Sequence, residues 1–231
     1  MLFYGDITMN MDKLKQFAII VCCSLFFGCG GSSGDNPDPP EPPVPPEPEI
    51  VLDPGTYIAM GCGVTEGSAH GQYEAWPEFL EAMLTGVQVV NLGNSRTYAV
   101  YGAYHIDEYM LEYKPQCVMV LYGVNDVAAG VPVDETITDL ENIVQVVQYY
   151  GGDIILGTIP RVPVYTSEEA GVLPELNMEI MALCTRYGIR CADVAKSLND
   201  SSLYREDGLH PTDEGEQKIA NVYRRIISDM Y

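Results

Sequence analysis

The sequence predicts an α/β fold, a three-layer α/β/α sandwich built on a five-stranded parallel sheet. Two observations carry this prediction. Short apolar runs alternate strictly along the chain with longer stretches of helical period. The runs are apolar at successive positions, which is typical of strands buried on both faces. Such a sheet is covered by helices on both sides, and its ligands bind beyond the carboxyl ends of the strands.

The expected strands are runs rich in Val, Ile and Leu, each of which stops at a polar or glycine-containing turn. They are YIAMG at 57–61, VQVVNL at 87–92, CVMVLY at 117–122, DIILGTI at 153–159 and IRCADV at 189–194. The expected helices are the intervening stretches in which apolar residues recur every three or four positions. They are 74–84, 101–113, 136–149, 167–187 and 212–230.

The first 54 residues do not read as folded domain. Lys13 and Lys15 precede an eleven-residue apolar run that ends in LFFGC, and the run is too short to span a bilayer. Residues 1–28 resemble the signal peptide of a bacterial lipoprotein. The resemblance implies that Cys29 is lipidated after cleavage and anchors the chain to a membrane, with the domain outside the cytoplasm, either periplasmic or at the cell surface.

Residues 29–54 contain eight prolines between Pro37 and Pro48, so we expect a semi-rigid, extended tether. The folded domain is then expected to span 55–231. Removing the eight acidic and two basic residues before Gly55 from the formal charge of −21 leaves 25 acidic against 10 basic residues. This charge makes nucleic acid a poor partner and favours neutral or esterified ligands. The sequence does not indicate an oligomeric state.

The sequence predicts no metal site and no cofactor. It contains no Cys-x-x-Cys pair, no histidine-rich spacing and no glycine-rich loop that would hold phosphate. Cys117 lies in an apolar run and is expected in the core. Cys184 and Cys191 could pair in an oxidising compartment, although one falls in an expected helix and the other in an expected strand.

Three polar motifs lie next to expected elements. NLGNSRT follows the second strand, YGVND follows the third strand, and DGLHPTDEG precedes the last helix. Each has an ordinary structural interpretation. Asn and Asp commonly terminate a strand in a turn. Thr212 or Asp213 could cap the last helix, with Glu216 at the offset of a capping box.

Taken together, in this order and at these strand ends, the motifs resemble those of the SGNH or GDSL hydrolase family. The resemblance extends over about 57–231 and implies a flavodoxin-like arrangement and acyl-transfer chemistry. It implies that His210 is the general base and that Asp207 orients its ring. Gly93 and Asn125 would then stabilise an oxyanion, together with the N–H at the nucleophile position.

The first motif of that family is altered. Gly61-Cys62-Gly63, aligned with Thr65 in place, puts Cys62 where the family has aspartate and Gly63 where it has the nucleophilic serine. Gly63 can still offer its N–H to an oxyanion. Three hypotheses follow: the protein binds without cleaving, Cys62 is the nucleophile, or His210 activates water directly.

Other candidates are weaker. Ser68 and Ser95 are interpreted as hydrogen-bonding residues of their loops, and we expect no catalytic role for His70 or His105. Several tyrosines could flank a cleft that stacks sugars, namely Tyr98, Tyr101, Tyr104, Tyr122 and Tyr165. We therefore predict an ester hydrolase-like lipoprotein related to carbohydrate acetyl or acyl esterases, whose ligand is a small ester or acylated carbohydrate. The alternative is an inactive protein of the same fold that binds glycan or ester ligands at the cell surface.

Overall fold

A computed structural model of the protein describes residues 53–67 and 74–231, which belong to one compact unit. A sheet of five parallel strands forms its centre, in the order β2-β1-β3-β4-β5. The strands are β1 (Asp53–Gly61), β2 (Gln88–Gly93), β3 (Pro115–Leu121), β4 (Asp153–Gly157) and β5 (Arg190–Ala192). This is the flavodoxin-like strand order, in which the chain changes direction across the sheet between β1 and β3. The predicted fold class is confirmed.

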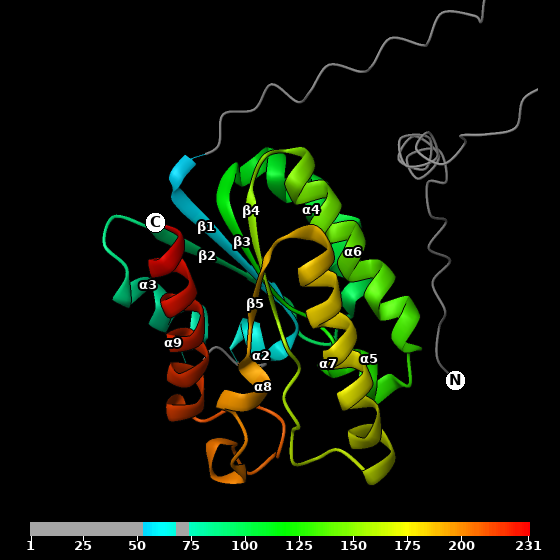
Figure 1. Ribbon diagram of the computed structural model, residues 1–231. Coiled ribbons are helices and arrows are strands. Elements are labelled where there is room, and N and C mark those ends of the chain that lie inside the picture. The colour runs from blue at the N-terminus through cyan, green and yellow to red at the C-terminus, as the bar shows by residue number, and fades with distance from the viewer. Residues whose placement is uncertain (1–52, 68–73) are drawn as a thin grey trace, which may run out of the picture. The chain divides into compact units, whose positions relative to one another are not determined.

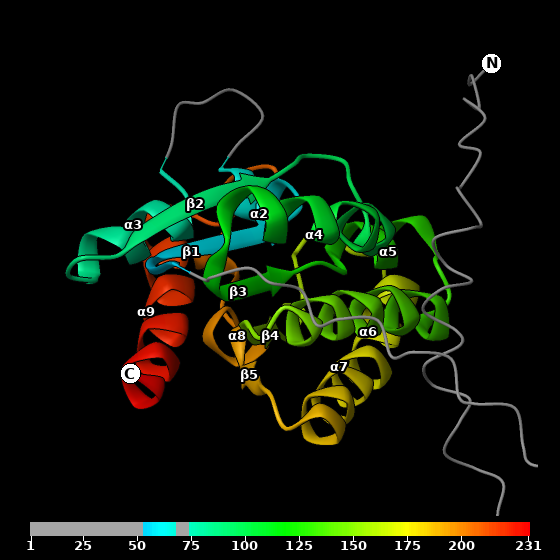
Figure 2. The same ribbon diagram turned by 90° about the horizontal axis from the view of Figure 1, so that it is seen from above.

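Helices cover both faces of the sheet (Figures 1 and 2). On one face α3 (Trp76–Met83) packs against α9 (Asp213–Met230). On the other face α6 (Val133–Tyr149) packs between α4 (Ala99–Tyr113) and α7 (Ser167–Tyr187). Short helices that the sequence analysis did not predict follow β1, β3 and β5: α2 (Gly63–Glu66), α5 (Val124–Ala129), α8 (Val194–Ser197) and the 3₁₀ turn η2 (Ser201–Leu203). Figure 1 shows α2, α5 and α8 at one end of the sheet.

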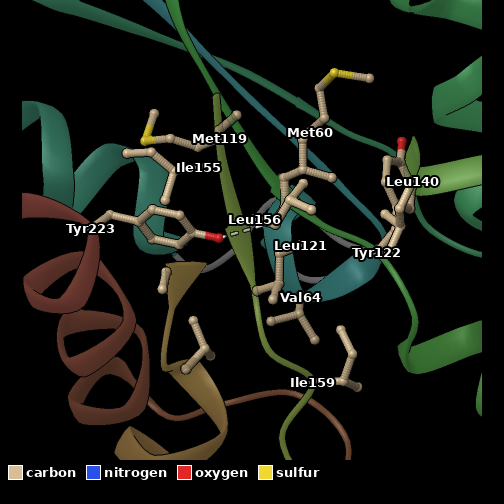
Figure 3. Close-up of a cluster of buried hydrophobic side chains, with 14 of the residues drawn as sticks. Met60, Val64, Met119, Leu121, Tyr122, Leu140, Ile155, Leu156, Ile159 and Tyr223 are labelled. Atoms are coloured by element: carbon tan, nitrogen blue, oxygen red, sulfur yellow. Dashed lines mark hydrogen bonds between the residues drawn. The ribbon is translucent and has the colours of Figure 1, made fainter. Parts of the chain in front are cut away.

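The core lies on both sides of β3 and β4, whose apolar side chains are buried (Figure 3). Tyr223 of α9 reaches into it, and its hydroxyl donates a hydrogen bond to Val120 O at 3.1 Å. The ring of Trp76 stacks on that of Tyr223 with centroids 4.5 Å apart. Burial raises the pKa of Tyr223 well above its usual value. The buried phenol therefore stays neutral, and its polar tip has the partner that burial requires.

Side-chain caps start two of the long helices. Thr166 and Glu169 form a capping box at α7, with Thr166 Oγ1 accepting from Glu169 N at 3.2 Å. Thr212 caps α9 by accepting a hydrogen bond from Gly215 N at 3.3 Å. The sequence leaves Thr212 and Asp213 as alternative caps. Glu216 does not complete a capping box there. It turns inward, is 3% exposed, and accepts a hydrogen bond from Trp76 N at 3.0 Å.

The first strand begins earlier than expected. Asp53 N donates to Lys114 O, and Asp53 Oδ1 accepts from Gly55 N at 2.9 Å. Asp53 and Pro54 therefore belong to β1 and not to the tether, because Asp53 already pairs with Pro115 at the start of β3. The expected signal peptide, Cys29 and most of the tether lie outside the described residues. Within the part that is described, no helix combines the length and apolar character needed to cross a membrane.

Candidate active site

The carboxyl ends of β1, β2 and β3 lie side by side. Gly61 is in register with Gly93 on one side and with Leu121 on the other. A Cβ on Gly61 would lie 2.1 Å from Thr65 Oγ1, and a Cβ on Gly93 would lie 2.2 Å from Glu66 N. Because neither residue has a side chain, α2 can pack directly onto the strand ends.

A cavity of about 200 Å³ opens beside α2. Its lining includes Cys62 and Gly63 at the start of α2, Ser95 and Arg96 from the loop after β2, Asn125 from α5, and His210 from the loop before α9. Four of the residues predicted from sequence therefore meet in one cavity: Cys62, Gly63, Asn125 and His210.

A larger cavity of about 720 Å³ lies at the other end of β4 and β5. Its lining includes Asp153, Ile189, Cys184 and Cys191, the last two as free thiols, but none of the predicted catalytic or oxyanion residues. Parallel sheets present their functional groups at the carboxyl ends of the strands. We therefore assign the candidate site to the smaller cavity.

Asp207 holds the ring of His210. His210 Nδ1 lies 2.8 Å from Asp207 Oδ2, and Asp207 Oδ1 accepts the backbone N–H groups of Leu209 and His210 at 2.8 and 2.9 Å. Gly208, with φ of 65°, allows this tight turn. Partial burial raises the pKa of Asp207, but the hydrogen bonds from His210 and Leu209 lower it by more than burial raises it. The pKa of Asp207 is therefore below its usual value. The ionised carboxylate accepts a hydrogen bond from the Nδ1–H group, so the proton stays on Nδ1 and Nε2 is the basic atom.

Nε2 faces position 63. A Cβ built on Gly63 would lie 2.9 Å from His210 Nε2 and 3.3 Å from Ser95 Oγ. Gly63 is not in the left-handed region, so its backbone would tolerate other residues. Glycine at position 63 therefore matters only because it leaves the space in front of the His210 imidazole empty. A ligand can occupy that space.

Asn125 approaches the cavity from α5. Its Nδ2 donates one hydrogen bond to Thr97 O at 2.8 Å, which fixes the amide and leaves its second N–H for a ligand. The neighbouring Asp126 is buried and accepts Ala99 N at 3.0 Å. Burial raises the pKa of Asp126 in spite of that bond. Asp126 thus ties α5 to the start of α4, and the amide of Asn125 is positioned by this connection.

The prediction for Gly93 is not supported. Its N–H already donates to Asn91 Oδ1 at 2.9 Å, and Gly93 does not line the cavity. Arg96 lines the cavity instead, with φ of 63°. No hydrogen bond from the Arg96 N–H is found among the described residues. This could not be predicted from the sequence, because an arginine in the left-handed region is uncommon and no residue pattern indicates it.

Cys62 also departs from its predicted role. Its side chain is 2% exposed, and desolvation raises the pKa of the thiol to about 11. A nucleophilic cysteine needs a thiolate at neutral pH, usually beside a cationic group. Cys62 is therefore a buried, protonated thiol at the start of α2, unsuited to attack a substrate.

Ser95, which the sequence analysis interpreted as a hydrogen-bonding residue of its loop, lines the cavity. Ser95 does form hydrogen bonds, but its partner is distant in sequence: both its N–H, at 3.1 Å, and its Oγ donate to Glu66 Oε2. The tyrosines do not flank this cavity, since Tyr122 and Tyr165 are buried and none of the five lines it. His105 lies on α4 outside the cavity, while Ser68 and His70 lie outside the described residues.

Comparisons with known proteins identify the family and the fold. A family model described as GDSL-like lipase/acylhydrolase matches residues 57–218. No curated protein matches the chain.

Among solved structures, 81 chains match. A member of the lipolytic G-D-S-L family from Veillonella parvula DSM 2008 is 17% identical, with a TM-score of 0.67 over 75% of this chain and 98% of that one. An acetyl xylan esterase from Geobacillus stearothermophilus is 18% identical, with a TM-score of 0.66 over 76% and 96%. A GDSL-like lipase from Bacteroides thetaiotaomicron VPI-5482 is 20% identical, with a TM-score of 0.64 over 77% and 89%. At these identities the likeness concerns the fold.

Proposed function

The chain belongs to the GDSL-like lipase/acylhydrolase family, and on that premise we propose that its domain hydrolyses small acyl esters, foremost acetyl or acyl esters of carbohydrate. One observation carries the proposal. The imidazole of His210, oriented by Asp207 at 2.8 Å, directs Nε2 at the unobstructed side of Gly63 inside a cavity large enough for a small acyl group. Similarity of the fold to an acetyl xylan esterase supports the choice of substrate.

In this function His210 moves the protons of the reaction. The ester carbonyl lies between Gly63 and Asn125, and its developing oxyanion accepts hydrogen bonds from the Asn125 amide and from the N–H groups of Gly63 and Arg96. Arg96 N–H takes the role that the sequence analysis assigned to Gly93. Asp207 keeps the reactive tautomer of His210 and stabilises the imidazolium. Cys62 has no covalent role.

The location is part of the proposal and rests on the sequence. A lipid on Cys29 would hold the domain at a bacterial membrane through the proline-rich tether, with the domain in the periplasm or at the cell surface. Acylated glycans of the cell envelope or of the surroundings would be within reach there.

A second candidate function is binding without turnover. The absence of a side chain at Gly63 and the protonated, buried thiol of Cys62 favour it, because neither residue of the altered motif can attack an ester. Under this function the cavity would capture an ester or glycan, and the lipid anchor would make the protein a surface receptor.

The two functions are separated by hydrolysis of a panel of acetyl esters, from nitrophenyl acetate to acetylated xylan, by the full chain in detergent. We expect turnover that is lost in His210→Ala and retained in Cys62→Ala. His105→Ala is the matched control, since this histidine lies on α4 away from the cavity. Absence of turnover in the wild-type chain, with xylan binding unchanged by His210→Ala, would establish the binding function instead.

A further inference from the structure

We propose that Ser95 is the nucleophile of this site and that Glu66 is the base that accepts its proton. The inference rests on the proposed esterase function and answers what replaces the serine that position 63 lacks. Ser95 lies in the NLGNSRT motif, where the sequence analysis interpreted it only as a hydrogen-bonding residue, and Glu66 directly follows the altered first motif.

The placement of Ser95 relative to His210 carries the inference. Ser95 Oγ and His210 Nε2 lie 3.3 and 2.9 Å from the same point, the position that a Cβ on Gly63 would occupy. Both residues line the same small cavity. A substrate carbon in front of Gly63 would therefore be within reach of both the hydroxyl and the imidazole.

Glu66 makes that hydroxyl different from an ordinary loop serine. The Ser95 hydroxyl donates to Glu66 Oε2, and the Ser95 N–H donates to the same oxygen at 3.1 Å. In the described part of the chain, Glu66 forms no ion pair with a lysine, arginine or histidine. Its carboxylate is thus a proton acceptor already in contact with the attacking group, which is the arrangement of an activated nucleophile.

The loop that carries Ser95 is held in a strained conformation. Arg96 and Lys114 are the two non-glycine residues with positive φ among those described, and Lys114 is the C-cap of α4. Arg96 has no such role. Left-handed conformations of non-glycine residues are strained and concentrate at functional sites. Asn94 Nδ2 donates to Tyr101 OH at 3.1 Å and secures the loop against α4.

The chemistry balances in two steps. In acylation, Ser95 Oγ bonds to the carbonyl carbon and its proton passes to Glu66, while the bond to the alkoxy oxygen breaks and that oxygen takes the proton from Glu66. In deacylation, Nε2 of neutral His210 takes a proton from water, whose oxygen bonds to the same carbon. Ser95 Oγ then leaves and takes that proton from His210. The sum is ester plus water giving acid plus alcohol.

The test combines a covalent probe with turnover of nitrophenyl acetate, using the full chain in detergent. Diethyl nitrophenyl phosphate should add one diethylphosphoryl group per chain, which mass spectrometry should place on Ser95. Ser95→Ala should abolish the adduct and lower turnover at least 100-fold, and Glu66→Gln should slow both. Ser228→Ala is the matched control, an exposed serine on α9 that does not line the cavity. Ser95→Cys should restore a nucleophile and become sensitive to iodoacetamide, which also shows that the loop tolerates substitution.

The outcomes distinguish this inference from the proposed function. Turnover that survives in Ser95→Ala and is lost in His210→Ala would overturn the inference and leave an esterase that uses activated water. An adduct on Ser95 without ester turnover would support Ser95 as nucleophile and overturn the esterase function. Neither turnover nor adduct in the wild-type chain would overturn both.

Discussion

Adding one carbon at position 63 tests the geometry of the site directly. In Gly63→Ala the new Cβ would lie 2.9 Å from His210 Nε2, whereas carbon and nitrogen in ordinary contact are about 3.5 Å apart. The ring must therefore withdraw by roughly 0.6 Å, at the expense of its 2.8 Å contact with Asp207. Weakening a hydrogen bond to a charged group costs about 1.5–3 kcal/mol at most, and displacements near 1 Å reduce rates by about 100-fold.

We expect Gly63→Ala to lower ester turnover between about tenfold and 100-fold. Stability should change little, because alanine in place of a helical glycine gains roughly 0.5–1 kcal/mol that offsets the crowding. The assays are nitrophenyl acetate hydrolysis and nitrogen NMR of the imidazole, in a chain with three histidines. Gly63→Ser should also be impaired, since it brings the same Cβ. A Gly63→Ser variant more active than wild type, with an unchanged His210 spectrum, would refute the reasoning and show that the site lacks only its serine.

Three further predictions follow from individual contacts. Asp207→Asn should lower turnover by about 100-fold or more, because its amide would donate to His210 Nδ1 and impose the wrong tautomer. The measurement is the pH–rate profile of this variant, with Asp213→Asn as the control. Equal rates for the two variants would contradict the prediction. Cys62 should resist iodoacetamide at pH 7.5 in the native chain, because burial raises the pKa of its thiol to about 11; peptide mapping of a modified Cys62 would contradict the burial. Burial raises the pKa of Glu216 well above 4.5, although Trp76 N donates to it. Its contribution to stability is therefore complete below about pH 4.5 and is lost as pH rises toward the folded-state pKa. Urea unfolding at pH 5 and pH 8 measures this: from pH 5 to pH 8 the free energy of unfolding should fall more in the wild type than in Glu216→Gln. Equal changes in the two proteins would contradict a raised pKa for Glu216.

The sequence was informative where periodicity decides the structure. Apolar runs such as 117–122 have one stable environment, the middle of a parallel sheet, so the five strands and the helices on both faces followed from the pattern. The pairing of Asp207 with His210 was equally predictable, because three residues of a tight turn bring the two side chains together. These features depend on neighbours in sequence.

Features that depend on contacts between distant segments were not predictable. Gly93 matched a motif, yet its N–H donates to Asn91 Oδ1, whereas no hydrogen bond from the Arg96 N–H is found within the described part of the chain. Ser95 bonds to Glu66, which lies 29 positions earlier in the chain. Cys62 was ambiguous because adjacent residues at the start of a helix point in different directions, and only packing decides which of them faces the core.

The charge of the domain bears on how an enzyme of the proposed kind would turn over. Its net charge from Gly55 onward is strongly negative, with 25 acidic against 10 basic residues. A neutral ester gains or loses little in this field, whereas the acetate it yields is an anion and is repelled. Among the described residues that line the cavity, Arg96 is the one lysine or arginine, and its side chain is exposed. The negative charge of the domain therefore repels the anionic product but not the neutral ester. This favours release of the acid over its retention beside His210.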